Sequence, residues 1–231
     1  MKFENTTVIG IENALIGMRL PMCKDCTDAR TKSDSFAERF NGNYIIGEKD
    51  LDLAKKLINA DEKNSYGQPN SKFLRMIHVQ VAITAPLYWW KEMDTYKVGT
   101  VANSTSTMHK LASNPITKEC FEMDDYDKEF GRIESVDNLR LPTMINQIWE
   151  NLIDDLEGLR FMYNETKDKR YWKELIRLLP ESWLQTRMFD CNYATLRQIY
   201  RQRKNHKLTE WLSFCDWVKT LPYANELIIG E

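Results

Sequence analysis

The sequence lacks several features that would place it in a specialised class. It has no run of about 18 apolar residues, so we expect no membrane span. Its N-terminus, Met1-Lys2-Phe3-Glu4-Asn5, lacks the apolar segment of a secretory signal. The phosphate-binding patterns G-x-x-x-x-G-K-[ST] and G-x-G-x-x-G are absent. The net charge is only −2, from 32 basic and 34 acidic residues, which argues against a protein that coats nucleic acid.

Cysteine and histidine are scarce. The five cysteines are an odd, scattered set, which is typical of reduced thiols in the cytoplasm. Cys23 and Cys26 have neither the preceding strand of a redox motif nor the second pair of a zinc site, so we interpret the pair as incidental. The three histidines, His78, His109 and His206, are too isolated to predict a metal site.

The 231 residues, of which 42% are apolar, predict one domain over residues 1–231 with mixed helix and strand. Alternation from Ile77 to Ile83 indicates a half-buried strand, and residues 3–11 and 183–191 are also predicted strands. Spacings of three and four predict helices over 12–18, 49–60, 87–93, 142–166, 171–179, 192–204 and 208–221. Residues 22–48, 61–71 and 113–138 are expected to be largely irregular.

The segment 197–207 carries five basic residues and no acid. Leu196, Ile199, Tyr200 and Arg203 share one helical face, which we expect to be buried, while Arg197 and Arg201 lie on the other side with Lys204. An arginine on an apolar face needs an anionic partner. Arg203 is therefore expected either in an internal salt bridge or in a ligand pocket, where its planar guanidinium suits phosphate or carboxylate.

Residues 95–109 are rich in small hydroxyl side chains, with one Lys and one Asn among them. Such groups offer the neutral hydrogen bonds that phosphates and nucleosides accept. An ordinary Ser/Thr loop explains the same composition. The aromatic run Tyr88-Trp89-Trp90 cannot face one way on a helix, so at least one ring is expected at a subunit, a ligand or solvent.

Two stretches of the sequence resemble parts of a known family. The first is Ala85-Pro86-Leu87-Tyr88-Trp89-Trp90-Lys91-Glu92, continuing to Lys110-Leu111, which is similar to the signature region of the flavin-dependent thymidylate synthases. Leu179-Pro180, then Asn192, then Arg203 is similar to the family's Leu-Pro, Asn and substrate Arg. The resemblance covers roughly residues 70–112 and 145–221.

The resemblance implies an α+β fold, an antiparallel sheet flanked by helices, and a homotetramer with shared active sites. The implied reaction methylates dUMP to dTMP with methylenetetrahydrofolate, FAD and NADPH, and no protein nucleophile attacks the base. The substrate, a pyrimidine deoxynucleotide, would be bound by Arg203, Arg177, Asn103, Thr105, Ser106 and Glu92. The flavin position would hold Thr95, Tyr96, Lys97, Asn192 and Gln198.

The sequence departs from the family's R-H-R motif. Those positions fall on Thr95-Tyr96-Lys97, or on Tyr96-Lys97-Val98 in the next register, so at most one positive charge survives. Lysine can serve as a point charge for phosphate but cannot replace a bidentate arginine. Two alternatives therefore stay open: a non-catalytic nucleotide sensor or sponge with the same fold, and a nucleic-acid-binding protein that uses the 197–207 helix.

Overall fold

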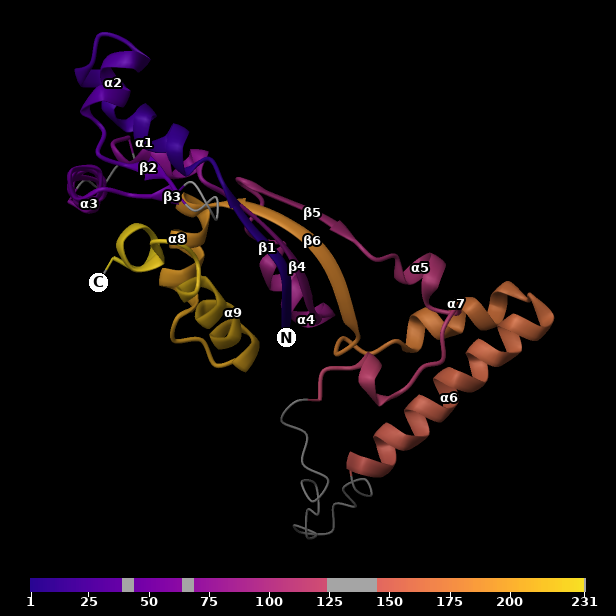
Figure 1. Cartoon of the computed structure of the whole chain (residues 1–231). Helices are drawn as coiled ribbons and strands as arrows, with labels where there is room; N and C mark the ends of the chain where they lie inside the picture. The colour runs from indigo at the N-terminus through magenta and orange to yellow at the C-terminus, as the bar shows by residue number, and fades with distance from the viewer. Residues whose placement is uncertain (39–43, 64–68, 124–144, 231) are drawn as a thin grey trace, which may run out of the picture. The chain divides into compact units, whose positions relative to one another are not determined.

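The computed structural model describes residues 1–38, 44–63, 69–123 and 145–230. Its main sheet has four strands in the order β1-β4-β6-β5, namely β1 (Lys2–Ile9), β4 (His78–Pro86), β6 (Leu184–Asn192) and β5 (Thr100–Ser104) (Figure 1). A small antiparallel pair, β2 (Phe36–Ala37) and β3 (Tyr44–Ile45), lies apart from it. The predicted strands at 3–11, 77–83 and 183–191 are confirmed, to within three residues at each end.

Side-chain contacts fix the direction of the two central strands. His78 Nδ1 lies 3.0 Å from Asp190 Oδ1, and Thr84 Oγ1 lies 2.7 Å from Thr186 Oγ1. Residue numbers therefore rise along β4 while they fall along β6, so the two strands are antiparallel. Val79, Val81 and Ile83 are fully buried while the residues between them are partly or fully exposed, as the alternation predicts.

The chain forms two compact units. The first comprises Met1–Ile83, Glu92–Asn103 and Arg187–Glu231, and the second comprises Thr84–Lys91 and Ser104–Thr186. Strands β4, β5 and β6 each begin in one unit and end in the other, so the division does not follow the order of the chain. The expectation of one domain over residues 1–231 stays a prediction.

The first unit contains helices from both ends of the chain. They are α1 (Ile11–Arg19), η1 (Leu20–Met22), α2 (Cys26–Lys32), α3 (Glu48–Glu62), η2 (Ser71–Met76), α8 (Tyr193–Arg203), α9 (Thr209–Lys219) and the π-helix η4 (Asn225–Ile229). Helix α8 packs against η2, η4 and α9 and therefore lies at the centre of this unit. Asn192 caps its N-terminus by accepting a hydrogen bond from the Thr195 amide, which confirms the predicted cap.

The second unit has its own hydrophobic core. Its elements are α4 (Leu87–Met93, of which the last two residues belong to the first unit), α5 (Thr107–Lys110), η3 (Lys118–Cys120), α6 (Ile145–Thr166) and α7 (Lys169–Leu178). Helices α6 and α7 pack against each other, with Leu156 and Leu175 fully buried. The apolar stripe predicted over 142–166 thus forms a helix in its described part. The expected irregular stretch 113–138 lies partly outside the described residues.

Two expectations need correction or refinement. Residues 22–48 contain α2, β2 and β3 and are not one long loop: Asp25 caps α2 by accepting from the Asp28 amide, a signal hidden among polar residues. In the aromatic run, Trp89 and Trp90 are buried and meet edge to face, with ring centroids 4.9 Å apart. Tyr88 is the half-buried member.

Candidate functional site

The buried face of α8 contains the three apolar residues that its periodicity predicts, Leu196, Ile199 and Tyr200. Arg197 is buried as well, with 3% exposure, so its predicted solvent-facing position is wrong. Its guanidinium pairs with Glu62 at the end of α3 and donates to the carbonyl oxygen of Ile228 at 3.0 Å. The reason is tertiary: the C-terminal π-helix η4 covers a second side of α8, which the periodicity of α8 alone does not reveal.

Burial and neighbouring charges shift the pKa values of Arg197 and Glu62. Burial lowers the pKa of Arg197, and repulsion from Arg201 lowers it further, against the opposing effect of Glu62. For Glu62, burial raises the carboxyl pKa, but hydrogen bonds from Arg201 and Arg197 outweigh it, so the net pKa is lowered. The bonds of Arg197 thus hold α3 and the C-terminal segment to α8.

Arg203, at the C-terminal end of α8, is half-buried, with 19% of its side chain exposed. Its Nη1 donates to Glu92 Oε2 at 2.8 Å, and its Nε donates to the Tyr96 hydroxyl at 2.8 Å. Its guanidinium carbon lies 4.5 Å from the centroid of the Trp211 ring. The internal salt bridge expected for Arg203 is thus present, and an aromatic face supports it.

Glu92 connects the elements of this cluster. Its Oε2 atom also accepts from Trp211 Nε1 at 2.9 Å and lies 3.7 Å from His206 Nε2. The Tyr96 hydroxyl in turn donates to Gln202 Oε1 at 2.9 Å. We call Glu92, Tyr96, Arg203, His206 and Trp211 the Arg203 cluster. All five residues belong to the first unit.

The guanidinium of Arg203 has more N–H donors than its contacts with Glu92 and Tyr96 use. It carries five N–H donors, and the contacts with Glu92 and Tyr96 use two of them. The other three have no protein acceptor in the part of the chain that the structure describes. A partly exposed arginine with free donors beside aromatic rings can bind a phosphate or carboxylate in bidentate fashion.

The residues assigned to the flavin position are only partly free. Thr95 Oγ1 donates to the carbonyl of Glu92 at 2.7 Å, Tyr96 is bonded in the Arg203 cluster, and Asn192 caps α8. Lys97 and Gln198 are exposed and have no partner among the described residues. A flavin diphosphate could therefore use the Lys97 ammonium and the Gln198 amide, whereas the other three groups already have structural bonds.

Gly99 explains how the chain passes the start of α8. Its φ is +76°, and a Cβ there would lie 2.7 Å from Asn192 Nδ2 and 2.8 Å from Thr195 Oγ1. Only glycine fits this approach. The turn between Tyr96 and β5 therefore rests directly on the helix N-terminus.

The predicted substrate loop is partly structural. Ser106 caps α5 by accepting from the His109 amide, and the Thr105 amide donates to the Thr186 carbonyl at 2.9 Å. Asn103 is exposed on β5 and has no side-chain partner among the described residues. Arg177 lies on α7 in the second unit, where it pairs with Glu174. Asn103 and Arg203 belong to the first unit, and Thr105, Ser106 and Arg177 to the second.

Sequence reasoning missed His206 and Trp211 as members of the Arg203 cluster. Both follow α8, and Trp211 belongs to the apolar pattern of α9, so nothing local separates it from an ordinary core residue. Across the described residues, no group of three His, Cys, Asp or Glu side chains could hold a metal ion. No helix in that part of the chain is long and apolar enough to cross a membrane.

Solved structures share this fold over the whole chain. The flavin-dependent thymidylate synthase ThyX from Helicobacter pylori, complexed with FAD and dUMP, is 17% identical with a TM-score of 0.63, covering 99% of this chain and 97% of that one. A second ThyX structure from that organism with the same ligands has 17% identity and a TM-score of 0.60, covering 98% and 94%. The UMP/dUMP methylase PolB from Streptomyces cacaoi, bound with 5-Br dUMP, has 13% identity and a TM-score of 0.53, covering 97% and 95%.

These similarities define the class of fold. The chain has the α+β fold of the flavin-dependent thymidylate synthases, with helices on an antiparallel sheet, which confirms the predicted fold class. No protein-family model matches the chain, and no curated protein sequence matches it. At 13–17% identity the likeness concerns the fold, so the ligands of this protein have to be argued from its own residues.

Proposed function

We propose that this protein binds a pyrimidine deoxynucleotide such as dUMP, with Arg203 holding the phosphate. The observation that carries the proposal is the partly exposed Arg203 guanidinium beside the Trp211 ring, with three donors that have no acceptor among the described residues. It lies in a fold whose solved examples were crystallised with dUMP or 5-Br dUMP. Asn103, which belongs to the same unit as Arg203, is proposed as a further substrate contact, and the assignment of Thr105, Ser106 and Arg177 in the second unit stays a prediction.

Glu92 makes this proposal specific. Its carboxylate already pairs with Arg203, so a nucleotide phosphate must compete with it or share the guanidinium. Glu92→Gln keeps an oxygen acceptor for Trp211 while removing the negative charge. We therefore expect tighter dUMP binding in this variant, by about two- to fivefold for a partly exposed charge, as measured by calorimetry.

We further propose the methylation of dUMP to dTMP with methylenetetrahydrofolate, FAD and NADPH. Of the five residues assigned to the flavin, Lys97 and Gln198 are those whose side chains have no partner among the described residues. The flavin, when bound, would supply the reducing equivalents for the new methyl group. The same proposal includes a homotetramer with shared active sites, which light scattering at micromolar concentration tests directly.

A nucleotide-binding protein without turnover is the second candidate. It is favoured by the engagement of Thr95, Tyr96 and Asn192 in structural hydrogen bonds. The visible spectrum of the purified protein, alone and after addition of FAD, separates the two candidates. Bound flavin together with dTMP formation supports the enzyme. A protein that binds dUMP but takes up no FAD supports the sensor or sponge.

Binding of nucleic acid is a further outcome that the same titrations test. It is suggested by three exposed basic residues, Arg201, Lys204 and Lys207. Salt-dependent affinity for DNA in the absence of any nucleotide binding would replace the main proposal.

A further inference from the structure

A cavity in the described part of the chain lies away from the Arg203 cluster. It has a volume of about 680 Å³ and lies within the first unit, between α1, η1, α3 and η2. This volume is in the range of pockets that hold small organic ligands. No residue of the Arg203 cluster and none of the residues assigned to the nucleotide lines it.

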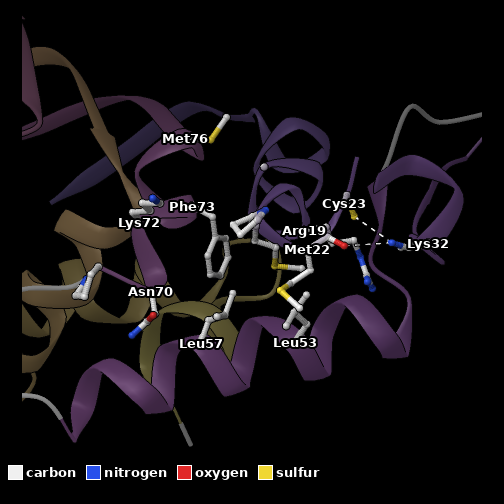
Figure 2. A pocket seen from close by; sticks show the side chains of 14 residues that line it. Arg19, Met22, Cys23, Lys32, Leu53, Leu57, Asn70, Lys72, Phe73 and Met76 are labelled. Atoms are coloured by element: carbon white, nitrogen blue, oxygen red, sulfur yellow. Dashed lines mark hydrogen bonds between the residues drawn. The ribbon is translucent and has the colours of Figure 1, made fainter. Parts of the chain in front are cut away.

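The interior of the cavity is apolar. Figure 2 shows Leu53 and Leu57 pointing from α3 toward Met22 of η1 and Phe73 of η2. Phe73 is only 2% exposed and forms part of the floor, whereas Met22 is 86% exposed at the opening. The free energy falls when an apolar ligand displaces water from apolar side chains that line a cavity.

The charges around the cavity are of one sign. Its lining includes Arg19, Lys32 and Lys72 but no Asp or Glu. Arg19 is paired with the buried Asp50, and Lys32 with Asp28, both outside the lining. Lys72 has no ion-pair partner among the described residues. Lys32 and Lys72 lie at opposite ends of the cavity in Figure 2.

We propose that this cavity binds an organic anion with an apolar body, specifically a carboxylate on a hydrocarbon chain. The apolar floor accounts for the body of the ligand, and the unpaired Lys72 at the rim accounts for its anionic head. A neutral hydrocarbon would make no ionic contact with the cationic rim. A small inorganic anion would leave the apolar floor in contact with water. The proposal goes beyond nucleotide binding and shares no residue with it.

Cys23 provides a direct reporter. Its thiol lines the cavity, with Sγ 3.7 Å from Lys32 Nζ, whereas the exposed Cys26 does not line it. Mass spectrometry can follow alkylation of both thiols in one sample of the full chain. Decanoate, below its micellar concentration, is expected to slow the alkylation of Cys23 and to leave Cys26 unchanged.

The chemical class is tested with matched probes of equal chain length. Decanoate should bind at least about fivefold more tightly than 1-decanol, because only the carboxylate meets the cationic rim. Decyltrimethylammonium, with the opposite charge, should give no protection. Equal protection by decanoate and 1-decanol would overturn the assignment of an anion.

Two substitutions locate the ligand. Lys72→Gln removes the unpaired charge and should weaken decanoate binding about two- to fivefold, as expected for an exposed charge. Lys56→Gln, on the solvent face of α3 and outside the cavity, is the matched control and should have no effect. Met22→Gln places a polar group at the opening and should weaken decanoate and 1-decanol alike.

The remaining outcomes are decisive as well. Decanoate binding should persist in Arg203→Ala, which separates this proposal from the proposed nucleotide site. No protection of Cys23, or equal protection of Cys23 and Cys26, would overturn it. Protection that appears without ligand and grows with protein concentration would show that a second copy of the chain covers the cavity, and would overturn it too.

Discussion

Arg197 and Arg203 lie six residues apart on the same helix, and their surroundings differ in kind. Arg197 is almost fully buried, pairs with Glu62 and donates to backbone carbonyls of the C-terminal segment. Gly230, with φ +79°, leaves room for its guanidinium: a Cβ there would lie 3.0 Å from Nη2. Arg203 is half-buried, uses two donors and faces the Trp211 ring.

The difference separates a structural arginine from a ligand-binding one. An arginine that is buried and bonded inside the fold can stabilise the protein, but an outside anion cannot reach it unless the elements that cover it move. An arginine with free donors and a partly open side can bind an anion at little structural cost. The following predictions test whether the two arginines of α8 really divide in this way.

The largest expected effect concerns Arg197. Arg197→Ala should lower the free energy of unfolding by about 2–4 kcal/mol, because it strands buried carbonyl acceptors and a charged partner. Urea unfolding of the two proteins gives the difference. Arg201→Ala is the control: Arg201 shares Glu62 but is 42% exposed, so its loss should cost less than about 1 kcal/mol. Equal losses of unfolding free energy in the two variants would mean that burial does not distinguish Arg197 from Arg201.

Arg203→Ala should show the opposite pattern. Its partner Glu92 keeps the hydrogen bond from Trp211 and is partly exposed, so we expect a loss of stability below about 1 kcal/mol. The affinity for dUMP should fall at least about tenfold, because a charge-assisted phosphate contact is lost. The dUMP affinity of Arg203→Lys should lie between those of the unchanged protein and Arg203→Ala, since lysine keeps the charge but cannot make a bidentate contact. Strong destabilisation with unchanged dUMP affinity in calorimetry would make Arg203 structural.

The same comparison applies to the substrate loop. Ser106 is an N-cap, so Ser106→Ala should cost about 0.5–1 kcal/mol of stability whatever its role in binding. Asn103 has no side-chain partner in the described structure, so Asn103→Ala should leave the melting temperature unchanged. Any weakening of dUMP binding by Asn103→Ala then reports a direct contact. A large thermal shift in that variant would show that Asn103 supports the loop.

The smallest expected effect is on pH dependence. The folded-state pKa of Glu62 is lowered, since the hydrogen bonds from Arg201 and Arg197 outweigh the effect of burial. Its contribution to stability is therefore present above the ordinary pKa of 4.5 and is lost as the pH falls through the folded value. Glu62→Gln should reduce the loss of stability on acidification below pH 4.5. Parallel profiles in urea titrations would contradict this contribution.

Several elements were predictable because their signals are local. The alternation of Val79, Val81 and Ile83 and the spacing of Leu196, Ile199 and Tyr200 both report a single buried face, and the structure confirms both. Helix α2 was missed because its cap, Asp25, is one of many polar residues in its stretch. The burial of Arg197 was missed because η4 covers α8 from a segment about 30 residues away.

The sequence by itself determined the phase of α8 and the inward position of Arg203, because periodicity and a capping Asn192 act within a few residues, whereas the class of fold followed from the resemblance to a known family. The tertiary structure decided which anion meets which arginine. Glu62 and Glu92 come from α3 and α4, 135 and 111 residues away from their partners. Contacts at such separations depend on how helices pack, so no local pattern specifies them, and packing buried Arg197 while it left Arg203 partly exposed.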